Sequence, residues 1–322
     1  MDNKKIVITA GEMSGVSAII ILKALQFPEI REISPIIYGD KYLINNLQEK
    51  LVKLDKIDYH KLNIVDKLNA KFEISQLGKP SDETGYAAGF YFESAIKDAL
   101  ENKIDAIVTA PLDKDNLQKG GYRFTGHTTM VKKLTNSNDA VMMLYGKHLK
   151  VALLTIHNPI NGVSSIINKE KIKKIVKIVN FEFKNKFKIE NPKIGILGLN
   201  PHAGENGKLG TEELEHYIPA INELKKEGIN IEGPYPADTY FHAIYKKYDV
   251  TIASYHDQGL IPLKMLHFDD GVNITLGIPI IRTSVDHGTA YDIANNFEKA
   301  SEKSLISAIK EAYRIAMLRE VN

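Results

Sequence analysis

The feature that most constrains this fold is a regular alternation of short β-branched runs with longer amphipathic stretches. Strands separated by helices are typical of an α/β fold with a mainly parallel sheet. The pattern predicts strands at 6–9, 105–109, 151–156, 193–199 and 250–254, and helices at 14–26, 84–101, 169–184, 212–227 and 304–318. We expect two α/β/α domains, the first formed by residues 1–125 and 288–322 and the second by residues 126–287.

Composition narrows the classes of function. The chain has 322 residues, of which 43% are hydrophobic, and this length suggests about two domains. The net charge is only +2 and the basic residues are scattered, so no nucleic-acid footprint is visible and we expect no nucleic-acid partner. The Lys-rich stretch 169–188 carries apolar residues at helical spacing, and we interpret it as a solvated helix face.

Cysteine usage and hydropathy exclude further classes. With no cysteine in the sequence, disulfides, thiolate nucleophiles and cysteine-ligated metals are ruled out. No apolar run approaches the ~20 residues of a membrane span, and no signal-peptide core is recognisable. We therefore expect a cytoplasmic protein without a membrane partner.

Four predicted strands run directly into polar clusters. The strand that ends at Thr109 leads into residues 110–114, and three others lead into His157, His202 and His256. Ligand sites of open α/β sheets lie beyond the carboxyl ends of strands. Three neutral imidazoles suit Zn, Co, Ni or Mn and leave positions open for substrate oxygens. The spacing is no metal motif by itself, and each histidine alone can equally be a loop residue hydrogen-bonded to the backbone.

Long, specific blocks of sequence surround these histidines. They are Ser-Tyr-His-Asp-Gln-Gly-Leu-Ile-Pro-Leu-Lys (254–264), Val-Asn-Ile-Thr-Leu-Gly (272–277), Ile-Arg-Thr-Ser-Val-Asp-His-Gly-Thr-Ala (281–290) and Gly-Leu-Asn-Pro-His-Ala-Gly-Glu (198–205). Shorter blocks lie at 109–114, 126–128 and 233–239. In their order along essentially the whole chain, these blocks resemble the 4-hydroxythreonine-4-phosphate dehydrogenase family.

The resemblance implies a fold and an activity. The fold is that of the isocitrate and isopropylmalate dehydrogenases, with a cleft between two domains, assembled as a homodimer with a shared active site. The activity is oxidation and decarboxylation of a small phosphorylated 3-hydroxy acid, with 4-hydroxythreonine 4-phosphate of pyridoxine biosynthesis as the expected substrate. The cofactors are NAD (or NADP) and one divalent metal, which is Zn, Mg, Co, Mn or Ni, bound by His157, His202 and His256.

The resemblance also assigns substrate-binding residues. They are His127, Thr128, Lys264, Asn273 and Arg282. Lysine and arginine pair well with phosphate and carboxylate oxygens, and arginine does so in bidentate geometry. The plainer alternatives are a surface amine for Lys264, a strand-end cap for Asn273 and a structural ion pair for Arg282.

Lys264, Asp238 and Asp257 are the candidate catalytic residues. The two aspartates either orient histidines or carry protons. Asp238 can equally be the N-cap of the helix that follows it.

The cofactor site has no independent motif. Gly11-Glu-Met-Ser-Gly15 is shorter than a Gly-x-Gly-x-x-Gly fingerprint and differently spaced. Gly204, Gly207 and Gly210 are spaced by three, which is enough to make a loop. The stretch 286–294 resembles the cofactor loop of the wider superfamily, or alternatively is a turn into the last helix. It gives the cofactor-binding candidates His287, Gly288, Thr289 and Asp292.

The chain departs from the family pattern at several cofactor and substrate blocks. Residues 11–19 replace a Pro- and Gly-rich run, Asp113 replaces Asn, Thr129 replaces Glu, and residues 295–296 are Asn-Asn where Gly-Lys is usual. The histidines and the phosphate-binding types survive. A paralogue that oxidises D-threonate or D-erythronate 4-phosphate is therefore one alternative. A catalytically inactive binding or regulatory protein on the same fold is another.

Overall fold

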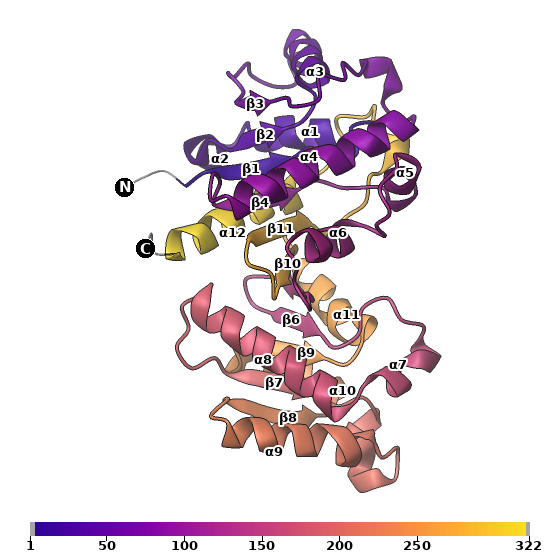
Figure 1. Cartoon of the computed structure of the whole chain (residues 1–322), viewed down its shortest axis with the longest axis vertical. Coiled ribbons are helices and arrows are strands. Elements are labelled where there is room, and N and C mark those ends of the chain that lie inside the picture. The colour runs from indigo at the N-terminus through magenta and orange to yellow at the C-terminus, as the bar shows by residue number, and fades with distance from the viewer. Residues whose placement is uncertain (1–3, 320–322) are drawn as a thin grey trace. The chain divides into compact units, whose positions relative to one another are not determined.

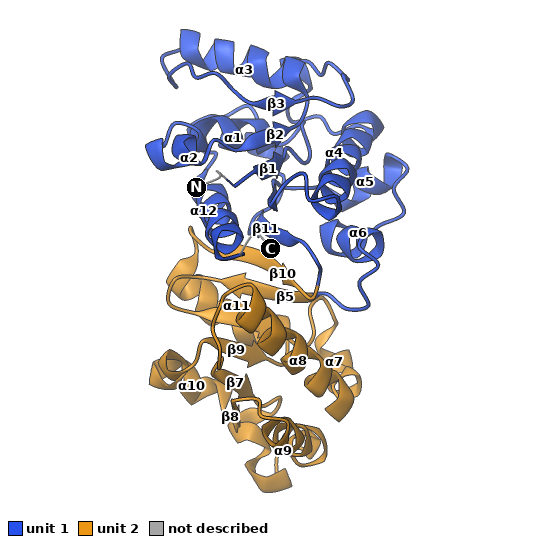
Figure 2. Cartoon of the chain, turned by 60° about the vertical axis from the view of Figure 1, so that its left-hand side comes forward, with its two compact units in different colours: residues 1–140, 278–320, 322 blue, residues 141–277, 321 orange. Residues whose placement is uncertain are grey.

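A computed structural model describes residues 4–319 of the chain. Contacts divide it into two compact units, residues 141–277 and the remainder of the described chain (Figure 2). The sequence-based boundaries lay near 125 and 287. The segments 126–140 and 278–287 instead belong to the first unit, because α6 (His127–Leu134) packs on α4 (Asp82–Leu100) and β11 (Ile281–Val285) pairs with β4 (Ala106–Thr109).

The first unit is built on a parallel sheet. Its strand order is β3-β2-β1-β4-β11, in which β1 is Ile6–Thr9, β2 is Ile36–Tyr38 and β3 is Ile64–Val65. Helices cover both faces of this sheet (Figures 1 and 2). One face carries α4, followed by α5 (Lys114–Lys119) and α6; the other carries α1 (Ser17–Ala24), α2 (Pro28–Ile33) and α12 (Lys303–Leu318), with α3 (Lys41–Lys53) beside α1.

The second unit has a mixed sheet. Its strand order is β10-β5-β6-β9-β7-β8, and β6, β9, β7 and β8 run parallel while β5 is antiparallel to both neighbours. The strands are β5 (Val141–Tyr145), β6 (Lys150–Leu153), β7 (Ile194–Leu197), β8 (Ile231–Tyr235), β9 (Val250–Ala253) and β10 (Val272–Leu276). The helices are α7 (Ile160–Ile166), α8 (Lys169–Asn185), α9 (Ile218–Lys226), α10 (Ala237–Ala243) and α11 (His256–His267). The predicted α/β class is confirmed, and β5, β8 and β10 are strands of this unit that the periodicity did not predict.

Helix α8 shows how the Lys-rich stretch folds. Asn168 caps it by accepting a hydrogen bond from the Lys171 backbone N–H at 2.9 Å. Its apolar residues at helical spacing are buried, which confirms the interpretation of the stretch as an amphipathic helix. The lysines on its polar face reach α9, where Lys173 lies 2.5 Å from a Glu223 carboxylate oxygen and Lys177 lies 2.6 Å from one of Glu227. Among residues 4–319, no helix combines the length and apolarity needed to cross a bilayer.

Candidate active site

The histidine edge of the second unit comprises His157, His202 and His256. These residues follow β6, β7 and β9, whose carboxyl ends share one edge because the three strands are parallel. The rings of His157 and His256 lie with centroids 5.8 Å apart. His202 belongs to the neighbouring loop, and no three metal-ligating His, Asp or Glu side chains converge within the described residues of one chain.

Asp257 orients the His256 ring. Its Oδ1 lies 2.7 Å from His256 Nδ1, so the tautomer that donates from Nδ1 leaves the Nε2 lone pair available. A carboxylate on the far nitrogen of an imidazole is the usual support of a histidine metal ligand. The imidazole donors of this edge therefore fit a divalent metal. Asp257 contacts the nitrogen of His256 that would not bind the metal.

The loop that carries His202 has an uncommon backbone. Every residue from His202 to Gly207 has a positive φ, between 43° and 88°. Left-handed backbone costs roughly 1–2 kcal/mol for each residue other than glycine, so this turn persists only if its surroundings hold it. The only sequence signal for it was the glycine spacing at 204, 207 and 210. Sequence reasoning missed Glu213, which accepts hydrogen bonds from the backbone just before the loop, and Tyr217, which hydrogen-bonds to Ser254.

The other candidates of the second unit are more scattered. Lys264 is half-buried on α11, the helix that begins at His256. Asn273 is the second residue of β10 and pairs with Leu144, which aligns it with the amino-terminal half of β6 and away from the histidine edge. Asp238 is exposed in the first turn of α10. The N-cap of that helix is Pro236, so the cap alternative for Asp238 is wrong.

The first unit brings Arg282 and His127 to one aromatic ring. Arg282 on β11 is 2% exposed, and its guanidinium donates to Thr109 Oγ1 at 2.9 Å. The guanidinium carbon lies 5.8 Å from the centroid of the Phe92 ring, and the His127 ring meets the same ring edge-on at 4.7 Å. Thr128 follows on α6 and is half-buried. The Arg282 and His127 side chains therefore both lie against Phe92, with Arg282 buried and the Nε2 of the half-buried His127 shielded from solvent.

Burial shifts the pKa values of both Arg282 and His127. It lowers the pKa of Arg282 to about 9, which leaves the guanidinium charged at neutral pH. The pKa of His127 lies well below its ordinary value of 6.5, because burial disfavours the imidazolium and Arg282 adds positive charge nearby. The buried Nε2 of His127 has no hydrogen-bond partner among the described residues. One fixed cation beside an unsatisfied neutral imidazole suits an anionic group of a ligand.

The predicted cofactor loop packs on the altered block 11–19. The Thr289 carbonyl accepts a hydrogen bond from the Val16 N–H at 2.9 Å, and a Cβ on Gly15 would come within 2.6 Å of the same oxygen. Thr289 is nearly buried, whereas His287, Gly288 and Asp292 are exposed. The substituted block thus still forms a close support for the loop.

Asp113, the second departure, has a structural use. Its Oδ1 accepts from the Asn116 backbone N–H at 2.8 Å and so caps α5.

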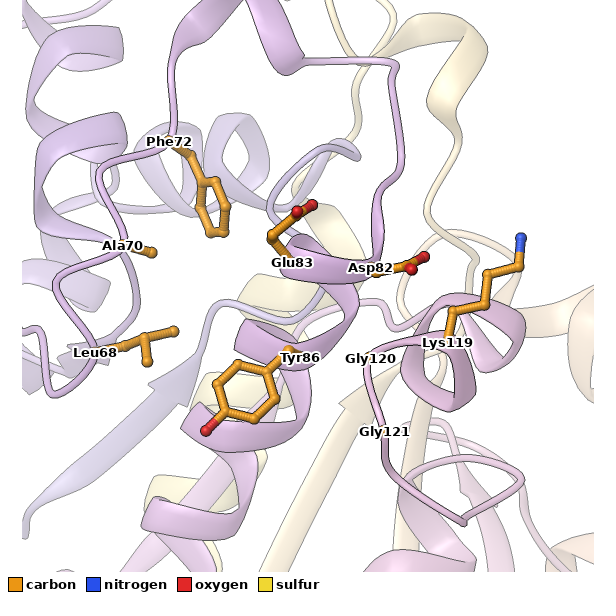
Figure 3. Close-up of a pocket in the computed structure, with 9 residues that line it drawn as sticks. All are labelled: Leu68, Ala70, Phe72, Asp82, Glu83, Tyr86, Lys119, Gly120 and Gly121. Carbon is orange, nitrogen blue, oxygen red and sulfur yellow. The ribbon is translucent and has the colours of Figure 1, made fainter.

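The first unit also contains a pocket of about 470 Å³. Figure 3 shows the residues that line it, which are Leu68, Ala70, Phe72, Asp82, Glu83, Tyr86, Lys119, Gly120 and Gly121. None of the predicted site residues lines this pocket.

Comparisons with known proteins agree on one family. The sequence model of one protein family, described as pyridoxal phosphate biosynthetic protein PdxA, matches residues 31–312. A 4-hydroxythreonine-4-phosphate dehydrogenase of Sulfurihydrogenibium sp. is 44% identical, over 98% of this chain and 99% of its own length. A D-threonate 4-phosphate dehydrogenase of Pectobacterium atrosepticum is 35% identical, over 98% of this chain and its full length.

A solved structure supports the same assignment. The 4-hydroxythreonine-4-phosphate dehydrogenase of Klebsiella pneumoniae superposes with a TM-score of 0.86 at 32% identity, covering 99% of both chains. The named relatives are dehydrogenases, which are oxidoreductases acting on a CH–OH group. Since the family model and these relatives each span most of the sequence, this chain belongs to the PdxA family of pyridoxal phosphate biosynthetic proteins.

Proposed function

We propose that this chain is a cytoplasmic, nicotinamide-linked and metal-dependent dehydrogenase that oxidises and decarboxylates 4-hydroxythreonine 4-phosphate. The family and its named relatives support the dehydrogenase activity. The observation that carries the substrate class is the buried Arg282 beside the unsatisfied imidazole of His127. In this proposal Arg282, His127 and Thr128 bind the phosphate, and Lys264 and Asn273 bind the rest of the acid.

The histidine edge would hold the metal. A divalent ion bound by His157, His202 and His256 supplies Lewis acidity toward the substrate oxygens, and NAD or NADP supplies the hydride acceptor. Asp257 keeps the His256 ring in the metal-binding tautomer. We assign to Lys264 Nζ the return of a proton after carbon dioxide leaves, with Asp238 as a further proton carrier. The loop with His287, Gly288, Thr289 and Asp292 would contact the cofactor.

A second copy of the chain completes the proposed site. Helix α11 and the residue after it present large exposed apolar side chains, with Met265 82% and Phe268 77% exposed next to Ile261 and Leu266. Such a patch marks an interaction surface, and twofold dimers are the commonest soluble assembly. If one metal histidine comes from the second copy, the lack of a three-ligand cluster within one described chain has a simple explanation.

Light scattering tests the dimer. We expect twice the chain mass of 36.1 kDa at micromolar concentration. Met265→Lys combined with Phe268→Lys should give monomers that bind metal poorly. Phe181→Lys changes an exposed aromatic residue of α8 in the same unit, 60% exposed, and should leave the dimer intact. A wild-type monomer with full activity would contradict the shared site.

The substrate is tested by nicotinamide reduction. 4-Hydroxythreonine, D-threonate and D-erythronate are compared with and without their 4-phosphates, using NAD and NADP in turn. We expect the highest kcat/KM for 4-hydroxythreonine 4-phosphate. A higher value for D-threonate or D-erythronate 4-phosphate would identify the chain as a paralogue that oxidises that acid. The Pectobacterium relative and the altered block 11–19 favour this alternative. Binding of the phosphate esters without any nicotinamide reduction would indicate a binding protein.

A further inference from the structure

We propose that the π-helical turn Glu213–Tyr217 is the positioning element of the histidine edge. Glu213 fixes the loop that carries His202, and Tyr217 fixes the strand end that leads to His256. The inference rests on the proposed metal-binding role of these histidines. Both residues act through other groups and have no part in the chemistry itself.

Glu213 anchors the loop from below. It is 2% exposed, and its Oε1 accepts hydrogen bonds from the backbone N–H groups of Leu199 at 2.7 Å and Asn200 at 2.8 Å. Its Oε2 accepts from the Asn200 side-chain amide at 2.9 Å. These residues directly precede Pro201 and His202. A buried carboxylate with three donors is a strong anchor, because removing it leaves partly buried N–H groups without their acceptor.

The sequence leaves room for this anchor. A Cβ on Gly204 would lie 2.6 Å from Glu213 Oε2, and one on Gly198 would lie 3.0 Å from Oε1. Both glycines therefore allow the loop to close onto the carboxylate. The left-handed backbone that begins at His202 is unfavourable by itself, so the closed loop depends on contacts such as those of Glu213.

Tyr217 anchors the second histidine segment. The residue is fully buried, and its hydroxyl lies 2.7 Å from Ser254 Oγ, which in turn donates to the Leu197 carbonyl at 3.3 Å. Burial raises the pKa of Tyr217, so the hydroxyl stays protonated and can act as the donor. Ser254 ends the strand region two residues before His256. Through Ser254, Tyr217 joins the end of β9 to the end of β7.

Hydrogen bonds of Gln258 on α11 and of Thr155 after β6 connect the histidine-bearing segments further. The Gln258 side chain accepts from the Ser254 N–H at 2.7 Å and donates to the Gly198 carbonyl at 2.7 Å. Thr155, which precedes His157 by two residues, donates to the Ser254 carbonyl at 2.8 Å. All three histidine-bearing segments are thus connected beneath the histidine edge. The π-helical turn contacts two of these segments through buried side chains, Glu213 and Tyr217, and π-turns in helices are frequent at functional sites.

The test compares variants of the turn with matched controls. Glu213→Ala removes the anchor, Glu213→Gln keeps one acceptor oxygen, and Tyr217→Phe removes only the hydroxyl. Glu215→Ala changes an exposed carboxylate of the same turn. Glu182→Gln changes another buried carboxylate of the second unit, which accepts from the Gly277 N–H. The first readout is amide hydrogen exchange of residues 199–207 in metal-free protein. The second is the dissociation constant for Co²⁺ and its absorption spectrum.

We expect Glu213→Ala to speed exchange of residues 199–207 and to weaken Co²⁺ binding by roughly 10–100-fold, the usual effect of losing support behind a ligand. Glu213→Gln should restore part of the loss, Tyr217→Phe should weaken binding less, and both controls should bind as the wild type does. Unchanged exchange in Glu213→Ala, or an equal loss of affinity in Glu182→Gln, would overturn the proposal. Retention of Co²⁺ by a variant lacking all three histidines would instead overturn the proposed metal site, while the exchange result would still decide whether Glu213 fixes the loop.

Discussion

The Arg282 site of the first unit and the histidine edge of the second fix their functional groups in different ways. Arg282 projects from a regular strand, is 2% exposed and lies against Phe92. His157 and His202 are exposed on irregular loops, and hydrogen bonds from buried groups beneath hold those loops. Packing holds the side chains of the first site, and their burial lowers the pKa values of Arg282 and His127. Hydrogen bonds hold the second site, so losing one of them should change the conformation of the loops that carry the histidines.

The largest effect should come from the histidine edge. The triple variant His157→Ala, His202→Ala and His256→Ala removes every proposed ligand, so near-stoichiometric metal and all activity should be lost. Elemental analysis and a dehydrogenase assay after chelation and metal return measure this. Full activity in the triple variant would show that the edge has no metal function.

Arg282 should have the next largest effect. Hydrogen bonds to charged groups contribute ~1.5–3 kcal/mol each, so Arg282→Ala should lower kcat/KM for the phosphorylated acid by about 100-fold or more. Arg282→Lys should fall between, because it keeps the charge and loses the bidentate geometry. Kinetics with and without the 4-phosphate, alongside circular dichroism to check folding, measure the effect. An intact phosphate preference in Arg282→Ala would place the phosphate elsewhere.

Asp257 tests the support behind one ligand. Asp257→Ala should weaken metal binding by ~10–100-fold, since it removes the acceptor that fixes the His256 ring. Asp257→Asn keeps an acceptor oxygen and should recover part of that loss. Titration calorimetry with the metal measures both. Equal affinity in Asp257→Ala and the wild type would mean that the hydrogen bond to Nδ1 does not support a ligand.

The smallest effect is electrostatic and belongs to His127. Its pKa is held below the ordinary 6.5 by burial and by Arg282, so below about pH 6.5 the unfolded chain binds a proton that the folded chain does not. The free energy of unfolding is therefore unaffected by this proton above about pH 6.5. It decreases as the pH falls below that value, by at most ~1.4 kcal/mol per pH unit. Urea unfolding of wild type and His127→Asn at several pH values measures it. Identical pH slopes would contradict a neutral, buried His127.

Several features could be read from residues alone. The strand at 6–9 and the helix expected at 169–184 follow from β-branched runs and helical periodicity, and both are present within a residue of the expected bounds. The family followed from long ordered blocks, and the comparisons confirm it. The N-cap alternative for Asp238 failed because the helix begins two residues earlier than that alternative required, directly after Pro236.

By itself the sequence determined the α/β class, the family and the identity of the strand-end histidines, because periodicity and ordered motifs are local properties of the chain. Only the tertiary structure decided that His127 and Arg282 share the Phe92 ring, since strands and helices far apart in sequence must pack before burial can act on either charge. It alone also revealed Glu213 under the loop of His202. A buried carboxylate is recognisable as an anchor only when the backbone N–H groups that surround it have been brought together by folding.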